Sequence, residues 1–268
     1  MHELTAQISR ADKEPKTITM EFPSCFEDFS RKHLLVLTEW LHTAKKDPTA
    51  FPKFIVQFIG IPKKVWKQLS AEQLFYCEVN DEGEVEMMPE LAYLSQRYEN
   101  LNSLIKRVGI LIGPDDRLKN ISLEQIAFAD HFSHAFAEDP SEKNLNHFFA
   151  ALYRPFFLPY HKDLLPLFQQ IARLVPRRTK EAALINYRGM TLASRQIYLT
   201  VFKSRKGKPS KIERLGWNGT IRKLAKTGIH GTEAQCRRLK YPDAMLTFDF
   251  NNIESEEQEE RLENIKKK

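Results

Sequence analysis

Two histidines, separated by three positions, form the most metal-like group in the sequence. His131 and His134 follow Asp130 in a stretch expected to be helical, and residues at i and i+3 can share a helix face, as metal ligands must. No Glu lies between them in the His-Glu-x-x-His pattern of zinc peptidases, and the pattern supplies no third ligand. We therefore interpret both imidazoles as exposed side chains on the flank of a helix.

Paired carboxylates occur at two other places, and turns or loops account for both. Asp115 and Asp116 stand in a Gly-Pro-Asp-Asp run, which is strong turn chemistry. Glu84, Glu86 and Glu90 have no apolar neighbours that would raise a carboxyl pKa for acid–base work, so we expect a solvated loop.

Other catalytic signatures are missing from the sequence. It contains no phosphate-binding glycine loop, no Gly-x-Ser-x-Gly and no Cys-x-x-Cys, and its three cysteines, Cys25, Cys77 and Cys236, lie far apart. We expect buried free thiols in a reducing compartment. We predict no catalytic residue, no metal and no cofactor, and thus a protein that is not an enzyme.

Charge is unevenly distributed along the chain, whose net charge is +6. Residues 173–240 carry 18 Lys and Arg against three Asp and Glu, whereas residues 241–268 carry four against eight. This contrast indicates either an anionic partner for the basic segment or an acidic tail that folds back over it.

The basic segment contains two candidate modes of contact with a polyanion. Residues 204–211 form a basic linker around Gly207 and Pro209 without interleaved aromatic residues, so it would bind phosphates rather than stack on bases. Residues 220–240 resemble a helix-turn-helix, except that Ala225 stands three rather than four positions before the turn residue Gly228. Basic helix pairs also bind acidic protein surfaces, and both readings stay open. The candidate contact residues are Arg205, Lys206, Lys208, Lys211, Arg222, Lys223, Lys226, Arg237, Arg238 and Lys240.

Helix-start signals and apolar periodicity predict the elements. Ser70 with Gln73 and Ser122 with Gln125 have capping-box spacing, and Thr232 is placed to cap a further helix. Residues 17–22 alternate as a short strand, and residues 108–112 and 117–121 flank a turn as a small hairpin. Helices are expected over about 31–46, 51–59, 70–79, 89–107, 123–138, 161–174, 178–202, 211–227 and 232–239, with a last short one from Pro242. A further helix is expected to begin at Ser141 and to stop at Arg154-Pro155.

These elements predict a mostly α protein: a multi-helix orthogonal bundle with one or two short β-hairpin elements and a small C-terminal helical unit. The predicted organisation is a flexible tail over 1–16, a main helical domain over 17–203, the basic linker over 204–211, a small basic helical unit over 212–250 and a charged tail over 251–268. No apolar run approaches the ~20 residues of a membrane-spanning helix, and the polar N-terminus is unlike a signal peptide. We expect a cytoplasmic protein with no membrane contact.

Three stretches in a fixed order resemble uncharacterised proteins of tailed phages and prophages from Bacteroidota-like hosts. The first is FPSCFEDFSRKHLLVLTEWL with FIVQFIGIPKKVWKQLSAEQL, the second ILIGPDDRLKNISLEQIAFADHF with NLNHFFAALYRP, and the third INYRGMTLASRQIYLTVF with GWNGTIRKLA. The first also resembles small tail-assembly chaperones through Phe58, Gly60, Ile61, Pro62, Leu69, Ser70 and Gln73, and the most specific match is the run Ala151–Pro155.

That resemblance implies virion assembly rather than catalysis. The expected partners are other phage structural or assembly proteins, in the cytoplasm of the bacterial host. Whether the protein is also incorporated in the finished particle does not follow from the sequence. The alternative is a nucleic-acid-binding module centred on residues 205–240. Oligomeric state does not follow from the sequence.

Overall fold

The structure, a computed structural model, describes residues 1–10, 13–43, 51–61, 77–79, 85–87, 91, 93–94, 96–202 and 216–266. Helices predominate among them, which confirms the mostly α class. The chain forms two compact units, Met1–Asn100 and Leu101–Lys268. The boundary lies after residue 100, inside the domain predicted over 17–203. It lies there because the residues of each unit make their contacts mainly within that unit.

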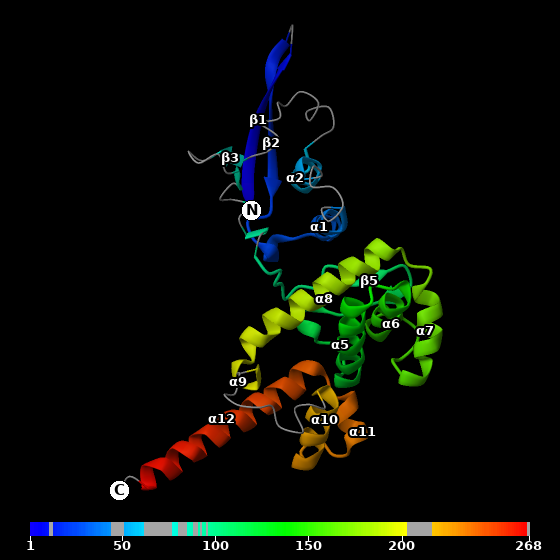
Figure 1. The fold of residues 1–268 in the computed structure, drawn as a ribbon, viewed down its shortest axis with the longest axis vertical. Helices are drawn as coiled ribbons and strands as arrows, with labels where there is room; N and C mark the ends of the chain where they lie inside the picture. Colours follow the sequence, from blue (N-terminus) through cyan, green and yellow to red (C-terminus); the bar gives the residue numbers. More distant parts are fainter. Residues whose placement is uncertain are drawn as a thin grey trace. The chain divides into compact units, whose positions relative to one another are not determined.

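In the first unit, an antiparallel hairpin replaces the flexible tail predicted over residues 1–16. Strand β1 (His2–Arg10) pairs with β2 (Lys13–Phe22), with Leu4 opposite Met20 and Ala6 opposite Ile18 (Figure 1). The prediction was wrong because β1 gains its order from pairing with β2, and its own composition is largely polar. The strand expected over 17–22 is the second half of β2.

An aromatic cluster forms the core of this unit. Helix α1 (Arg31–Thr43) contacts α2 (Phe51–Ile59), and the predicted α2 bounds are confirmed because Gly60, at φ +83°, ends the helix. Phe29 makes edge contacts with Phe26 and Phe58, and Asn100 donates to the carbonyl of Phe26 at 2.6 Å. Phe26 belongs to a short 3-10 turn, η1 (Phe26–Asp28).

Two helices expected in the first unit have different structures where the chain is described. Strand β3 (Cys77–Val79) pairs with β4 (Val85–Met87), so the helix predicted to end at residue 79 does not include its last three residues. The capping box at Ser70 and Gln73 lies outside the described residues. Residues 97–107 contain no helix, although the sequence predicted one over 89–107.

A three-stranded antiparallel sheet opens the second unit. Strand β5 (Arg107–Val108) pairs with β6 (Leu111–Ile112), which pairs with β7 (Arg154–Pro155). The hairpin predicted between 108–112 and 117–121 was wrong, because the chain turns earlier, at Gly109, whose φ is +57°. Residues 116–118 form the 3-10 turn η4 (Asp116–Leu118) instead of a strand.

Gly113 lies against the flat face of a buried ring, so it has no room for a side chain. An added Cβ would overlap the ring of Tyr153, which stacks on Phe149 at 4.0 Å and donates its hydroxyl to the Ile105 carbonyl at 2.7 Å. We expect Gly113→Ala to lower the free energy of unfolding by about 1–3 kcal/mol, as overpacking does. Urea titration in a Tyr153→Leu background is the control. An equal loss in both backgrounds would show that the ring contact is not the cause.

The helices of the second unit form a bundle (Figure 1). Its members are α5 (Leu123–Glu138), α6 (Glu142–Leu152), η5 (Lys162–Leu164), α7 (Leu165–Ala172), α8 (Arg177–Ile197) and α9 (Leu199–Phe202). The predicted capping box of Ser122 and Gln125 is confirmed at the start of α5. The helix predicted over 178–202 is divided at Tyr198, where the backbone leaves helical geometry.

The C-terminal helical unit consists of α10 (Gly216–Thr227), α11 (Glu233–Arg238) and α12 (Tyr241–Lys266). The last helix was expected to be short, with a charged tail after residue 250. Instead α12 continues without a break through the acidic run (Figure 1). Pro242 is tolerated because it is the second residue of the helix.

Candidate interaction surface

Helices α10 and α11 are held to the bundle by their inner faces. Ile221, Leu224 and Cys236 are fully buried, and both helices contact α5. Between α11 and α12, the amide of Tyr241 donates to the Ile121 carbonyl at 2.8 Å, and Leu123 donates to the Leu239 carbonyl at 2.9 Å. These contacts fix the orientation of the outer faces, where the basic residues lie.

The turn between the two helices has five residues and a left-handed conformation at two of them. Gly228 and Gly231 have φ of +73° and +79°. Thr232 then caps α11 through a complete capping box with Gln235, as its position in the sequence predicts. The apolar Ile229 at the tip of the turn is 64% exposed.

The outer face of α10 carries three exposed cations, which we call the basic face: Arg222, Lys223 and Lys226. Positions i, i+1 and i+4 span about 100° of a helix, so the three charges point to one side. Within the described part of the chain, neither lysine has an acidic partner, and Arg238 on α11 is also exposed. The basic face is therefore available to an anion.

A single carboxylate partly neutralises the edge of this face. Glu233 lies 2.7 Å from Arg237 and 3.6 Å from Arg222. These neighbours, Arg237 first, lower the pKa of Glu233 below its ordinary value. Arg237 also donates to Asn218 at 3.2 Å, so its guanidinium connects α11 to α10.

The Lys240 side chain is bonded within the chain, unlike the lysines of the basic face. Its Nζ donates to the Asn120 carbonyl at 2.8 Å, and its backbone bridges to Ser122. The predicted contact residues thus fall into three groups. Arg222, Lys223, Lys226 and Arg238 are exposed, and Arg222 also pairs with Glu233. The exposed Lys240 and the half-buried Arg237 are bonded within the chain, and Arg205, Lys206, Lys208 and Lys211 lie outside the described residues.

Helix α12 has a packed face and an exposed apolar stripe on the opposite side. Tyr241, Ala244, Met245 and Phe248 are buried against the bundle. Leu246, Phe250 and Ile253 are 58%, 66% and 43% exposed, and the spacing of i, i+4 and i+7 aligns them along the other side. We call these three residues the α12 stripe. The sequence did not predict this stripe, because Pro242 indicated only a short last helix.

The two histidines of α5 line a pocket of about 530 Å³, together with Arg195, Phe202 and Trp217. The neighbouring Asp130 accepts from Tyr187 Oη at 2.7 Å and from Trp217 Nε1 at 2.5 Å. One carboxylate oxygen of Asp130 therefore bonds to α8 and the other to the start of α10, so Asp130 links both helices to α5.

The other carboxylates singled out in the sequence have local roles where they are described. Asp116 accepts from the Ser103 amide at 2.8 Å and from Lys106 Nζ at 2.7 Å, which closes a turn. Asp115 immediately precedes η4. Glu86 lies in β4, whereas Glu84 and Glu90 are outside the described residues. No group of three or more His, Cys, Asp or Glu suited to a metal ion occurs in the described part of the chain.

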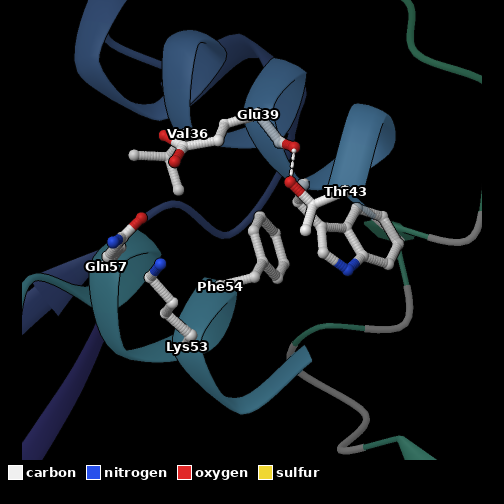
Figure 2. A pocket seen from close by; sticks show the side chains of 7 residues that line it. Val36, Glu39, Thr43, Lys53, Phe54 and Gln57 are labelled. Atoms are coloured by element: carbon white, nitrogen blue, oxygen red, sulfur yellow. Dashed lines mark hydrogen bonds between the residues drawn. The ribbon is translucent and has the colours of Figure 1, made fainter. Parts of the chain in front are cut away.

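A second, much smaller hollow lies between α1 and α2 in the first unit. Figure 2 shows its walls, including Val36, Phe54 and the hydrogen bond from Thr43 Oγ1 to the Glu39 carbonyl at 2.8 Å. Its volume of about 30 Å³ is the space of a single water molecule. Trp40 stacks on Phe54 at 4.7 Å beside it, and most of the other lining residues are polar: Glu39, Thr43, Lys53 and Gln57.

Comparisons with protein-family models, with characterised proteins and with solved structures find no match for this chain. None of the helices described here is both long and apolar enough to cross a membrane.

Proposed function

We propose that this chain is a non-enzymatic assembly or structural protein of a tailed phage, comparable to a tail-assembly chaperone, which acts by binding other proteins of the particle. The observation that supports it is the α12 stripe. A helix that buries one face and exposes Leu246, Phe250 and Ile253 on the other presents apolar surface suited to a second contact. The assembly setting is supported by the order of the three sequence stretches.

Co-purification with tail proteins tests this function. Changing Leu246, Phe250 and Ile253 together to Gln keeps residues that favour helix and removes the apolar side chains. We expect tail structural proteins, identified by mass spectrometry, to be lost from the variant and kept by wild type. The matched control changes three exposed apolar residues elsewhere, Ile110, Leu167 and Leu174, to Gln. Equal recovery of tail proteins with both variants contradicts the proposal.

Nucleic-acid binding is the second candidate function, and the basic face favours it. In a DNA-binding helix-turn-helix the second helix reads base edges, while the first crosses the phosphate backbone. Here α11 has six residues and the exposed cations lie mainly on α10. This arrangement suits phosphate contact of low sequence specificity.

The salt dependence of binding to a DNA duplex measures that contact. Each neutralised phosphate adds about 0.9 to the slope of log K against log salt. Changing Arg222, Lys223 and Lys226 to Glu should reduce the slope by about three and weaken binding at all sequences. The control reverses exposed charges at Lys143, Lys162 and Arg173. An unchanged slope in the basic-face variant excludes this mode.

A further inference from the structure

The acidic second half of α12 continues beyond the part of the helix that packs on the bundle. From Glu254 to Ile265 every described side chain is exposed. These residues extend away from α10 and α11, so the acidic tail does not fold back over the basic segment (Figure 1). Most helical stability in proteins comes from packing. A partner that runs along α12 would supply that packing to the exposed half of the helix.

Exposed carboxylates lie at both ends of the α12 stripe, on its side of the helix. Asp243 stands three positions before the first stripe residue, and Glu254 stands four positions after the second, so each shares a side with the stripe. Glu260 stands seven positions after the last stripe residue, two turns further along the same line. All three are exposed, and none is paired with a cation within the described part of the chain. We call these three residues the acidic rim.

Arg261 also follows the stripe, but its charge is already balanced. Its guanidinium lies 3.6 Å from Glu257 within the helix. The surface along the stripe is therefore apolar over two turns, about 10 Å, and negatively charged beyond both ends. Such a surface attracts cations and repels phosphates, so it does not fit nucleic acid.

The backbone of α12 limits the form that the partner can take. Its amides and carbonyls are bonded along the helix, so α12 offers only side chains to a second chain. A partner strand would bury backbone N–H and C=O groups that find no bond there, whereas a partner helix bonds its own. Apolar residues at i, i+4 and i+7 on α12 also match the apolar face of a second amphipathic helix.

We propose that α12 binds a basic amphipathic helix of another protein, whose apolar face packs on the α12 stripe and whose Lys and Arg residues lie against the acidic rim. This inference rests on the proposed function, because it names the kind of segment through which a protein of the particle contacts the stripe. The apolar contact supplies most of the affinity. The exposed ion pairs are individually weak and select the partner by charge.

Two designed helical peptides test the charge of the partner. Both carry Leu at i, i+4 and i+7, and these residues are flanked by Lys in one peptide and by Glu in the other. Fluorescence anisotropy with the full chain at about 0.1 M salt, where the Debye length is about 10 Å, measures each Kd. We expect the Lys-flanked peptide to bind about a hundredfold more tightly: about tenfold for three ion pairs and about tenfold for three like-charge contacts avoided. The ratio should shrink at about 1 M salt, where the Debye length is about 3 Å.

Neutralising the acidic rim should change the two affinities in opposite directions. With Asp243→Asn, Glu254→Gln and Glu260→Gln together, the Kd of the Lys-flanked peptide should rise about tenfold and that of the Glu-flanked peptide should fall about tenfold. A variant that fails to fold cannot bind one of the peptides more tightly, so this pair of shifts separates charge from stability.

The control variant neutralises three exposed carboxylates outside α12: Glu27→Gln, Asp115→Asn and Glu138→Gln. It should bind both peptides like wild type. Peptide that still binds when the α12 stripe is changed to Gln is bound elsewhere on the chain and is subtracted. The inference is overturned by equal Kd values for the two peptides on wild type, by no binding of the Lys-flanked peptide, or by an acidic-rim variant that binds like wild type. None of these results alters the co-purification of tail proteins, so failure of this inference is distinguishable from failure of the proposed function.

Discussion

Glu142→Gln is expected to lower the free energy of unfolding by about 2–4 kcal/mol, more than Lys180→Met. Lys180 is fully buried, and its ammonium pairs with Glu142 while donating to Asn146 Oδ1 at 2.6 Å and to the Ala172 carbonyl at 3.3 Å. Removing the carboxylate leaves a buried charge with neutral acceptors only. Glu142 is 47% exposed, so water moderates this loss.

Removing the lysine instead, with Lys180→Met, should destabilise the fold less, because each group that remains has another environment available. Met fills the volume of Lys180, and the half-exposed Glu142 returns to water, so Lys180→Met should cost about 1–2 kcal/mol for the two acceptors that lose their donor. The double variant should resemble Lys180→Met alone, since the two residues act as a unit. Urea unfolding of the three variants measures this. A larger loss for Lys180→Met than for Glu142→Gln would show that the buried charge is not the cost.

Asp130→Ala should have the second large effect and should lower the free energy of unfolding by about 2–4 kcal/mol. It removes the acceptor of the Tyr187 hydroxyl, which is buried, and of the half-buried Trp217 indole N–H, and unsatisfied buried donors cost about 1–3 kcal/mol each. Burial, with Asp130 next, raises the pKa of Tyr187 well above its ordinary value. The stability that results from this difference in the pKa of Tyr187 is therefore fully present below the ordinary tyrosine pKa. It is lost at higher pH, because the Tyr187 phenol ionises more readily in the unfolded chain.

Thermal unfolding followed by circular dichroism measures the Asp130 effect. At roughly 2–4 °C per kcal/mol for a domain of this size, Tm should fall by about 5–15 °C. Tyr187→Phe removes the hydroxyl donor itself, so that donor is not left unpaired. Tm should therefore fall less than it does in Asp130→Ala. His134→Ala, at an exposed pocket residue, should leave Tm unchanged. Equal Tm values for Asp130→Ala and His134→Ala would contradict the anchoring role.

Local signals in the sequence predicted the best-defined helices. Gly60 ends α2, the capping box of Ser122 and Gln125 begins α5, and Thr232 begins α11, each because the side chain or φ preference acts within a few residues. Partners distant in sequence could not be predicted in this way. Strand β7 pairs with β6 about 40 residues earlier, and β1 owes its order to β2.

The same distinction between local signals and partners distant in sequence applies to the interaction surface. Composition identified Arg222, Lys223 and Lys226, because a charged face on an amphipathic helix is visible in sequence. It did not separate them from Lys240, whose bond to the Asn120 carbonyl depends on tertiary packing. Likewise, Asp130 was considered with its histidine neighbours, although its partners Tyr187 and Trp217 are 57 and 87 residues away.

Photo-crosslinking from the α12 stripe tests the central claim most directly. A photoreactive amino acid at position 250, on the outer side of α12, reports what covers the helix in cells that produce the phage. The proposed function predicts a crosslink from position 250 to a tail structural protein, and none from position 174, which is 85% exposed on another surface of the unit. Tail-protein crosslinks of equal yield from both positions, or crosslinks from position 250 to nucleic acid alone, would contradict it.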